Sequence, residues 1–211
     1  MNALSYLLIL ISKRVNPLHV EDLANRMVLD VGCGEGDFMA KDPLNRVGVD
    51  IDAELVRRCK GRGLDARCMS ATKLGFPDDS FDAVHGAELI EHFEPKTAVQ
   101  FLSEAARVLK PGGIVYLTTP GERYVWNTFS HVRPYPPIAF KKLFGTSTEG
   151  FIQDNSIPLK LECYFAFRRV SHNRLITGLM NTLNVAIPPR WPSGYVLILR
   201  KNVIVYRERH R

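Results

Sequence analysis

The run VLDVGCGEG, residues 28–36, constrains the fold more than any other stretch of the chain. Strand-forming apolar residues lead into three glycines at alternate positions, Gly32, Gly34 and Gly36. Glycine allows a sharp turn and lets the backbone approach a ligand without a Cβ in between. A helix that follows would offer unpaired N–H groups. The pattern therefore predicts a ligand-binding loop between a buried strand and a helix.

The spacing of these glycines favours one kind of ligand. A dinucleotide fingerprint reads GxGxxG and directs a helix dipole at a pyrophosphate. Here the spacing is GxGxG, and Asp30 lies two residues before the first glycine. A carboxylate at that position suits the ammonium group of an amino-acid moiety better than it suits a pyrophosphate.

Short apolar runs alternate with helical patterns through the first two thirds of the chain. The patterns predict helices over 53–60 and 95–109 and strands over 27–31, 46–50, 66–69, 80–86 and 114–118. Strands that alternate with helices predict a parallel sheet with helices on both faces and right-handed crossovers. Residues 121–150 predict a long irregular connection, of the kind that often forms a lid. Beyond it we expect strands over 159–169 and 195–200 and a helix over 173–183.

Asp50 is the second candidate ligand residue. It lies at the end of the second predicted strand, 14 residues after Gly36. A carboxylate there can accept hydrogen bonds from both hydroxyls of a ribose, which predicts an adenosine-bearing ligand at the carboxyl edge of the sheet. Capping of the following helix is assigned to Asp52, just before Ala53.

Four motifs carry a family resemblance: VLDVGCGEGDF, VGVDID, FPDDSFDAVHGAELIEHF and EAARVLKPGGIVYLTTP. Their order and spacing resemble the class I S-adenosylmethionine-dependent methyltransferases, in particular the type 11 and ubiquinone-biosynthesis O-methyltransferase group. The resemblance covers about residues 20–120. It implies an α/β, Rossmann-like, doubly wound and mostly parallel seven-stranded sheet with an antiparallel C-terminal edge strand. We expect one domain over 1–211: an N-terminal helical segment (1–26), a cofactor-binding core (27–120) and an acceptor-side loop with C-terminal strands (121–211).

The resemblance also implies S-adenosylmethionine as cofactor and gives roles to individual residues. The backbone from Gly32 to Gly34 lines the methionine part, and Asp30 orients it. Asp50 holds the ribose, and Ile51 packs on the adenine. The cofactor-binding set that the resemblance implies is Asp30, Gly32, Cys33, Gly34, Asp50, Ile51, Ser70, Ala71 and Ala87.

The positions after the third and fourth predicted strands are compared with the family pattern. The family often has an Asp-Ala pair after the third strand, where the aspartate meets the adenine amino group. Here the pair is Ser70-Ala71, so a hydroxyl replaces the charge and the adenine contact differs in detail. Ala87, after the fourth strand, is expected near the methionine part of the cofactor.

The segment Glu88-Leu89-Ile90-Glu91-His92 predicts a metal site. On a helix, Glu88, Glu91 and His92 would share one face, and His131 lies in the loop expected above the same sheet edge. Two carboxylates and imidazoles suit Mg²⁺ or Mn²⁺. The segment resembles both the ubiquinone-biosynthesis O-methyltransferases and the small-RNA terminal 2′-O-methyltransferases, where a similar set holds a divalent ion. The alternative is a metal-free pocket wall in which His131 or His92 acts as general base.

The distribution of charge along the chain does not identify the methyl acceptor. The net charge is +6, but residues 1–120 hold 14 Lys+Arg against 17 Asp+Glu, whereas residues 121–211 hold 14 against 5. A basic C-terminal half is consistent with an anionic partner or with a solvated surface. We therefore expect O-methylation of a hydroxyl on a small molecule, lipid or glycan. RNA ribose 2′-O-methylation is the first alternative and a non-catalytic cofactor-binding scaffold the second.

The remaining features bear on location. The four cysteines form no CxxC pair, which favours a reduced, cytoplasmic setting. The apolar run 4–11 is too short to span a membrane and does not resemble a signal peptide. It predicts an amphipathic helix that packs on the domain, or alternatively a peripheral membrane contact.

Overall fold

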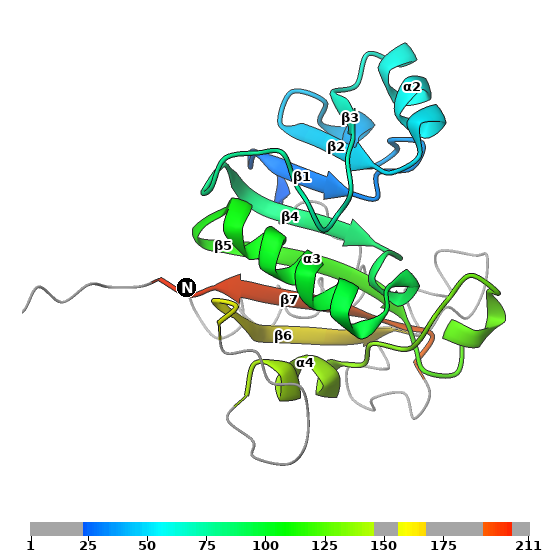
Figure 1. Ribbon diagram of the computed structural model, residues 1–211, viewed down its shortest axis with the longest axis vertical. Helices are drawn as coiled ribbons and strands as arrows, with labels where there is room; N and C mark the ends of the chain where they lie inside the picture. Colours follow the sequence, from blue (N-terminus) through cyan, green and yellow to red (C-terminus); the bar gives the residue numbers. More distant parts are fainter. Residues whose placement is uncertain (1–22, 146–155, 168–191, 204–211) are drawn as a thin grey trace, which may run out of the picture.

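A computed structural model describes residues 23–145, 156–167 and 192–203. Its centre is a seven-stranded sheet in the order β3-β2-β1-β4-β5-β7-β6 (Figure 1). The strands are β1 (Val28–Val31), β2 (Arg46–Asp50), β3 (Ala66–Cys68), β4 (Phe81–Ala87), β5 (Leu109–Pro120), β6 (Leu159–Phe167) and β7 (Gly194–Lys201).

Strands β1 to β5 are parallel to one another, so their carboxyl ends lie along one edge of the sheet. Strand β1 pairs with β2 on one side and β4 on the other. The strand order therefore reverses beside β1, at the kind of switch point where open α/β sheets bind ligands. The loop that follows β5 lies at this edge as well (Figure 1).

The C-terminal strand β7 runs antiparallel to both of its neighbours. This confirms the mostly parallel seven-stranded sheet with an antiparallel C-terminal strand, but the expected position of that strand at the edge is wrong. The strand lies between β5 and β6, so β6 forms the outer edge. Strand β7 is buried along most of its length, as expected for a strand that is paired on both sides.

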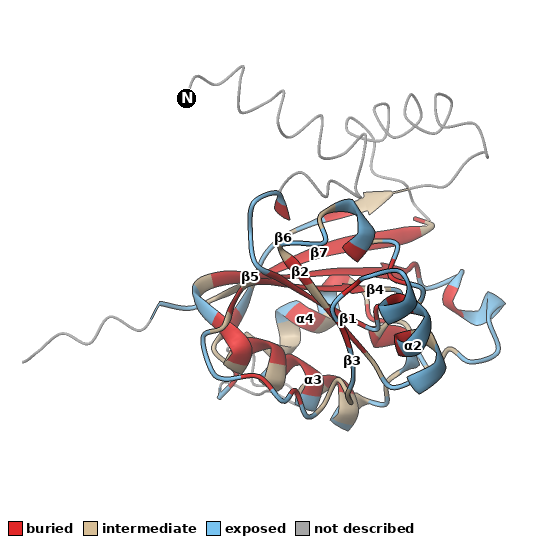
Figure 2. Ribbon diagram, turned by 90° about the horizontal axis from the view of Figure 1, so that it is seen from above, coloured by how far each residue is buried: buried red, intermediate tan, exposed pale blue. Residues whose placement is uncertain are grey.

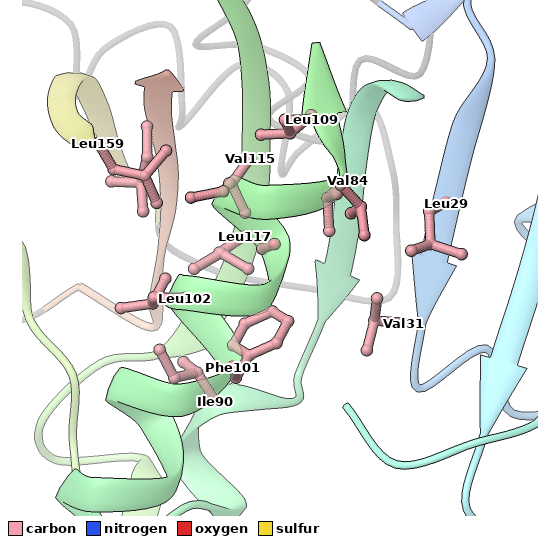
Figure 3. Packing of buried hydrophobic residues seen from close by; sticks show 14 of the residues in the cluster. Leu29, Val31, Val84, Ile90, Phe101, Leu102, Leu109, Val115, Leu117 and Leu159 are labelled. Atoms are coloured by element: carbon pink, nitrogen blue, oxygen red, sulfur yellow. The ribbon is translucent and has the colours of Figure 1, made fainter. Parts of the chain in front are cut away.

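Helix α3 (Pro95–Val108) covers one face of the sheet. Its buried residues recur at helical spacing: Ala98, Phe101, Leu102, Ala105 and Ala106. They pack on Leu29, Val84, Val115 and Leu117 from the strands (Figure 3). Full burial of such a side chain contributes about 1.5–3 kcal/mol, so this layer dominates the core. Proline at the first helical position explains where the helix begins. The helix ends at Val108, and β5 follows at once, so the expected turn at Pro111-Gly112-Gly113 lies within the strand.

Helix α2 (Ala53–Gly61) lies on the opposite face. On β2, Val49 faces the α3 side, whereas a Cβ added at Gly48 would meet Met39. Met39 packs with Val56 and Cys59 of α2. Figure 2 shows α3 and α4 together on one side of the sheet. Helices on both faces confirm the doubly wound arrangement.

The structure corrects two local expectations. No α-helix follows the glycine loop, where only a 3-10 turn, η2 (Met39–Lys41), occurs. Nine residues separate Gly36 from β2 and include Pro43, which leaves too little chain for a longer helix. Within the irregular connection, α4 (Pro137–Leu143) is a helix that begins with proline at its first position.

Two expectations lie outside the described residues: the helix over 173–183 and the apolar run 4–11. No helix among the described residues is long and apolar enough to cross a membrane.

Candidate cofactor and acceptor site

The glycine loop leaves β1 at the carboxyl edge of the sheet. Gly32, Gly34 and Gly36 have φ angles of 72°, 53° and 80°, which residues with a Cβ rarely adopt. The amides of Gly32 and Cys33 donate to the carbonyl of Val49, at 2.8 and 3.0 Å. A Cβ added at Gly34 would meet nothing within 4 Å, so the space above this residue is open to a ligand.

Asp50 lies beside this loop, at the end of β2. Its Oδ2 accepts a hydrogen bond from the amide of Gly34 and its Oδ1 one from the amide of Asp52, both at 2.9 Å. The carboxylate is therefore fixed in orientation, and each oxygen keeps a lone pair for a ligand hydroxyl. Asp52 caps α2 as predicted, because its side chain accepts from the amides of Glu54 and Leu55.

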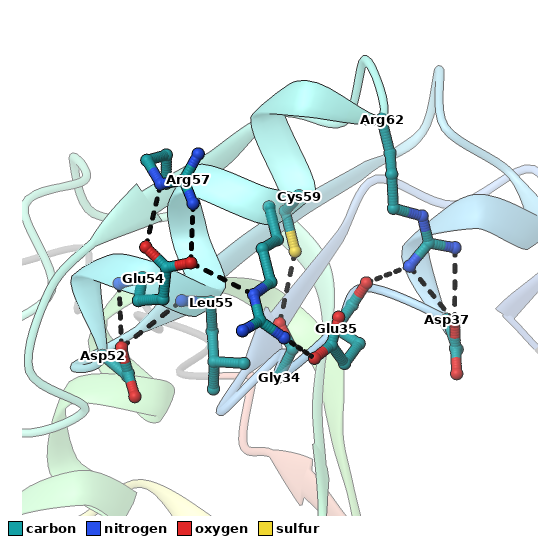
Figure 4. A network of polar contacts seen from close by, with 10 residues as sticks. Gly34, Glu35, Asp37, Asp52, Glu54, Leu55, Arg57, Cys59 and Arg62 are labelled. Carbon is teal, nitrogen blue, oxygen red and sulfur yellow. Dashed lines mark hydrogen bonds and ion pairs between the residues drawn. The ribbon is translucent and has the colours of Figure 1, made fainter.

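Charged residues brace the outside of the loop (Figure 4). Arg58 bonds Glu35 at 3.0 Å, and Arg62 bonds Asp37 at 3.2 Å and the carbonyl of Glu35. These ion pairs are exposed, so each contributes little to the free energy of unfolding. They connect α2 to the glycine loop and limit where the loop can move.

The remaining predicted cofactor residues lie along the same edge. Ile51 is 78% exposed, so an apolar side chain stands open beside Asp50. The Ser70 hydroxyl pairs with Thr72 at 2.9 Å, and Ala71 follows it. The Cys33 thiol is buried, and burial raises its pKa, so it stays neutral and serves as a packing group.

Asp30 has a partner that the sequence analysis did not identify. His85 of β4 donates from Nδ1 to Asp30 Oδ1 at 2.7 Å, and both side chains are buried. The ring of Phe38 stacks on His85 at 3.9 Å, and Arg46 lies over Phe38. Asp30 and His85 are paired positions in the register of β1 with β4. That register is known only from the structure, so the sequence did not reveal the pair.

Glu88 does not lie on a helix, which corrects the expected one-face arrangement. Its φ is +49°, and its amide donates to the carbonyl and the hydroxyl of Thr118, at 3.0 and 3.2 Å. The turn after β4 is a 3-10 helix, η3 (Ile90–His92), which begins only after Glu88. The chain bends at Glu88, and its side chain is not in the cluster formed by the other predicted ligands.

That cluster consists of Glu91, His92 and His131. One ligand atom from each lies within 4.8 Å of the others. His131 Nε2 is 3.9 Å from Glu91 Oε1, and the two imidazole rings meet edge to face at 4.8 Å. The amide of Val132 donates to the carbonyl of Glu91 at 2.8 Å, which holds the loop after β5 against η3.

Both imidazoles of the cluster are oriented by backbone carbonyls. His131 Nδ1 donates to the carbonyl of Val125 at 2.7 Å, and His92 Nδ1 donates to that of Ser130 at 3.1 Å. A donor at Nδ1 leaves the lone pair of Nε2 free in the neutral imidazole. This arrangement suits a metal ligand and a general base equally.

Glu91 is fully buried, and neither carboxylate oxygen has a hydrogen-bond partner among the described residues. Burial, and to a lesser extent the charge of Glu88, raises the pKa of Glu91 to about 7. A buried charge without a partner is costly. The fold therefore favours the protonated, neutral form of Glu91, and the charged form needs a compensating positive group.

The raised pKa of Glu91 predicts that the free energy of unfolding depends on pH. From pH 4.5 to 7 the folded protein keeps a proton on Glu91 that the unfolded chain loses, so the free energy of unfolding falls as pH rises through that window. With about 1.4 kcal/mol per pKa unit, the loss is on the order of 3 kcal/mol. Glu91→Gln should abolish this fall, as measured by urea unfolding at pH 5 and pH 8 in a chelator. Glu94→Gln, at an exposed neighbour, is the control, and an unchanged pH dependence in Glu91→Gln would contradict the assignment.

The loop between β5 and α4 exposes aromatic side chains near the cluster. Tyr124, Trp126 and Phe129 are exposed, and Trp126 lies in the short 3-10 helix η4 (Val125–Asn127). Tyr135, by contrast, is buried, and its hydroxyl donates to the carbonyl of Phe93. The first three residues are available to an acceptor, whereas Tyr135 packs the loop onto the domain.

Comparisons with known proteins show similarity to methyltransferases. Residues 29–117 match a family model described as a methyltransferase domain. The chain is 38% identical over 112 residues to a fatty-acid O-methyltransferase of Mycolicibacterium smegmatis, covering 49% of this chain and 40% of that protein. It is 32% identical over 115 residues to a probable tRNA methyltransferase 9B of Homo sapiens, covering 54% and 24%. The chain thus spans less than half the length of either relative.

Solved structures support the fold. A crystal structure of a SAM-dependent methyltransferase from Archaeoglobus fulgidus superposes with a TM-score of 0.61 at 20% identity, covering 91% of this chain and 93% of that one. At this identity the likeness concerns the fold alone.

Proposed function

We propose that this chain, a SAM-dependent methyltransferase whose residues 29–117 match a methyltransferase-domain model, methylates a hydroxyl oxygen of a small molecule, lipid or glycan. The observation that carries the choice of oxygen is the Glu91, His92 and His131 cluster at the carboxyl edge of the sheet. A hydroxyl acceptor must lose its proton, and this cluster presents groups that can take it. Nothing comparable is needed for an acceptor that is already nucleophilic.

The cofactor of the family is S-adenosylmethionine, and the residues of the loop fit it. The open space above Gly34 accommodates a ligand, and the fixed carboxylate of Asp50 suits the two hydroxyls of a ribose. In our proposal the Gly32–Gly34 backbone lines the methionine part and Ile51 packs on the adenine. The pocket is completed by Ser70, Ala71 and Ala87. Asp30 orients the methionine end of the cofactor, and its hydrogen bond with His85 holds the Asp30 carboxylate in place.

In this proposal the chain positions the reactants and accepts a proton. When bound, the cofactor supplies an electrophilic methyl group on a sulfonium sulfur. The residues along the sheet edge hold the acceptor in line with it. His131 Nε2 takes the hydroxyl proton, because Nδ1 is held by Val125 and the free lone pair faces the cluster. His92 is the second candidate base, with its Nδ1 held by Ser130.

Glu91, His92 and His131 also fit a divalent cation such as Mg²⁺ or Mn²⁺. The two unpartnered oxygens of Glu91 and the two free Nε2 atoms form a mixed set of oxygen and nitrogen donors. A bound cation would supply positive charge that compensates Glu91 and lowers the pKa of an acceptor hydroxyl.

The metal proposal has its own test. Mn²⁺ should bind the wild-type protein with one site by calorimetry, and Glu91→Gln should weaken it by roughly 10–100-fold, since hydrogen-bonded or coordinated charged groups contribute a few kcal/mol. Glu88→Gln, outside the cluster, should change the affinity less than threefold. If both substitutions weaken Mn²⁺ binding equally, Glu88 is also a metal ligand. If no heat of Mn²⁺ binding is detected, the metal proposal is wrong and the histidine acts as a base without a metal.

RNA ribose 2′-O-methylation is the second candidate. It is favoured by the excess of Lys+Arg in residues 121–211 and by similarity to a probable tRNA methyltransferase. The tests differ in salt dependence, because each phosphate contact on RNA releases counterions. Transfer of a tritiated methyl group to RNA with a steep loss of affinity between 50 and 200 mM salt would favour RNA.

The experiment for the proposed function is an acceptor survey. Wild-type protein is incubated with methyl-tritiated S-adenosylmethionine and a panel of phenols, hydroxylated lipids, glycans and RNA, and products are identified by mass spectrometry. The proposal predicts a methyl ether. A methylated nitrogen or carbon on the best acceptor would contradict it.

The cytoplasm remains our proposed location. All four cysteines are free thiols in the structure, which is typical of reducing compartments.

A further inference from the structure

Helices α3 and α4 lie on the same side of the sheet (Figure 2). Side chains of these helices and of the connection before α4 line a groove. Its volume is about 390 Å³, within the range of small-molecule sites. Its lining comes from α3, the connection before α4, and α4 itself: Pro95, Ala98, Val99, Leu102, Arg133, Tyr135, Ile138, Ala139, Phe140, Lys142 and Leu143.

The interior of the groove is apolar. Leu102 and Phe140 belong to the buried core, so the groove opens directly onto core side chains. Ile138, on its wall, is 55% exposed although α4 is otherwise anchored by buried residues. An aliphatic ligand would remove this surface from water, at about 25 cal/mol for each Å² covered.

The polar groups of the groove are cationic. Arg133 and Lys142 are its charged residues, and no carboxylate is in the lining. The guanidinium of Arg133 lies over the ring of Tyr135 at 5.2 Å, and among the described residues it makes no ion pair. The Tyr135 hydroxyl is already used by the carbonyl of Phe93, and burial raises its pKa to about 12, so the ring stays neutral.

From this combination we propose that the α3–α4 groove binds a single-chain aliphatic carboxylate, a ligand of the fatty-acid class. The alkyl chain lies along α3, where the lining from Pro95 to Leu102 extends over about 10 Å of helix. The carboxylate pairs with Arg133, whose planar fork matches its two oxygens. A phosphate fits less well, because the lining offers no free hydroxyl for its additional oxygens.

The groove is separate from the Glu91, His92 and His131 cluster but continuous with it along the chain. Pro95 lies three residues after His92, the last residue of η3, and Arg133 lies two residues after His131. The amides of Val132 and Arg133 approach the carbonyl of Glu91 at 2.8 and 3.4 Å. The proposal does not depend on methyl transfer, so its failure and that of the proposed function are distinguishable.

The test is calorimetric titration of the full chain with dodecanoate below its micellar concentration. Dodecanol and dodecyl phosphate serve as neutral and phosphate comparators. Arg133→Gln removes the paired cation, and Ala139→Trp fills the groove. The matched control is Lys141→Gln, an exposed lysine on α4 that is not in the lining. Val99→Trp fills the groove from α3 and replaces Ala139→Trp if that variant does not unfold cooperatively.

The proposal predicts saturable binding of one dodecanoate per chain. Arg133→Gln should weaken it by roughly 10–100-fold, the loss expected for a charge-assisted hydrogen bond, and the groove-filling variant should abolish it. Lys141→Gln should stay within twofold of wild type. The proposal is overturned by an absence of binding to wild type, by unchanged affinity in the groove-filling variant, by dodecanol that binds as tightly as dodecanoate, or by dodecyl phosphate that binds more than tenfold more tightly.

Discussion

Replacing Asp50 by alanine is expected to weaken the binding of S-adenosylmethionine by at least about 100-fold. In our account the carboxylate accepts from two ribose hydroxyls, and each such bond to a charged group contributes about 1.5 kcal/mol or more. The same carboxylate accepts from the amides of Gly34 and Asp52. The substitution therefore also releases the glycine loop that it holds. Equilibrium dialysis with radiolabelled cofactor measures the affinity directly.

Asp65→Ala is the matched control for this prediction. Asp65 precedes β3, and its carboxylate pairs with exposed Arg67 at 3.1 Å rather than with the loop. Its affinity for the cofactor should equal that of wild type within twofold. If Asp50→Ala keeps wild-type affinity while it folds normally, the ribose does not lie at the end of β2 and the cofactor site is misplaced.

Replacing His131 by alanine should reduce turnover by 10²- to 10⁴-fold, the usual contribution of a positioned general base. Cofactor affinity should stay unchanged, because His131 lies in the loop after β5 and not on the glycine loop. The measurement compares initial rates on the best acceptor with S-adenosylhomocysteine affinity for the same preparation.

His131→Asn separates the base from the loop anchor. An asparagine amide can take the place of Nδ1 and donate to the carbonyl of Val125, while no group replaces Nε2. The account predicts that both variants lose turnover to a similar extent. Recovery of the rate in His131→Asn would show that the histidine only anchors the loop, and equal loss of turnover and cofactor affinity would place it in the cofactor site.

The sequence predicted those parts of the fold that depend on local patterns. The glycine spacing and the alternating apolar runs located β1 to β5, and Asp52 was correctly identified as the cap of α2. These signals are local, because turn chemistry and hydrophobic periodicity act over a few residues. The position of β7 between β5 and β6 depends on strand pairing over a long sequence separation.

The errors arose where the space available to the chain overrides local preference. A helix was expected after the glycines, but the short connection to β2 allows only η2. The spacing of Glu88 and Glu91 predicted that both lie on one face of a helix. In the structure Glu88 adopts a φ of +49° and is separated from the cluster. Such a backbone conformation is uncommon for a residue other than glycine and has no sequence signature here.

The bond between Asp30 and His85 illustrates a different limit. Each residue lies in an apolar strand run, where a polar side chain is expensive to bury unless it finds a partner. The partner is 55 residues away and becomes evident only from the register of β1 with β4. Buried polar residues in predicted strands are therefore a signal that a pair exists, without identifying the pair.

Calorimetric titration of the wild-type chain with S-adenosylhomocysteine, with and without Mg²⁺ or Mn²⁺, tests the central claim most directly. The account predicts one saturable site per chain, with the cofactor product bound at the edge defined by Gly34 and Asp50. No heat of binding under any of these conditions, in a protein that unfolds cooperatively, would contradict it: the chain would keep the fold of the family without its cofactor site.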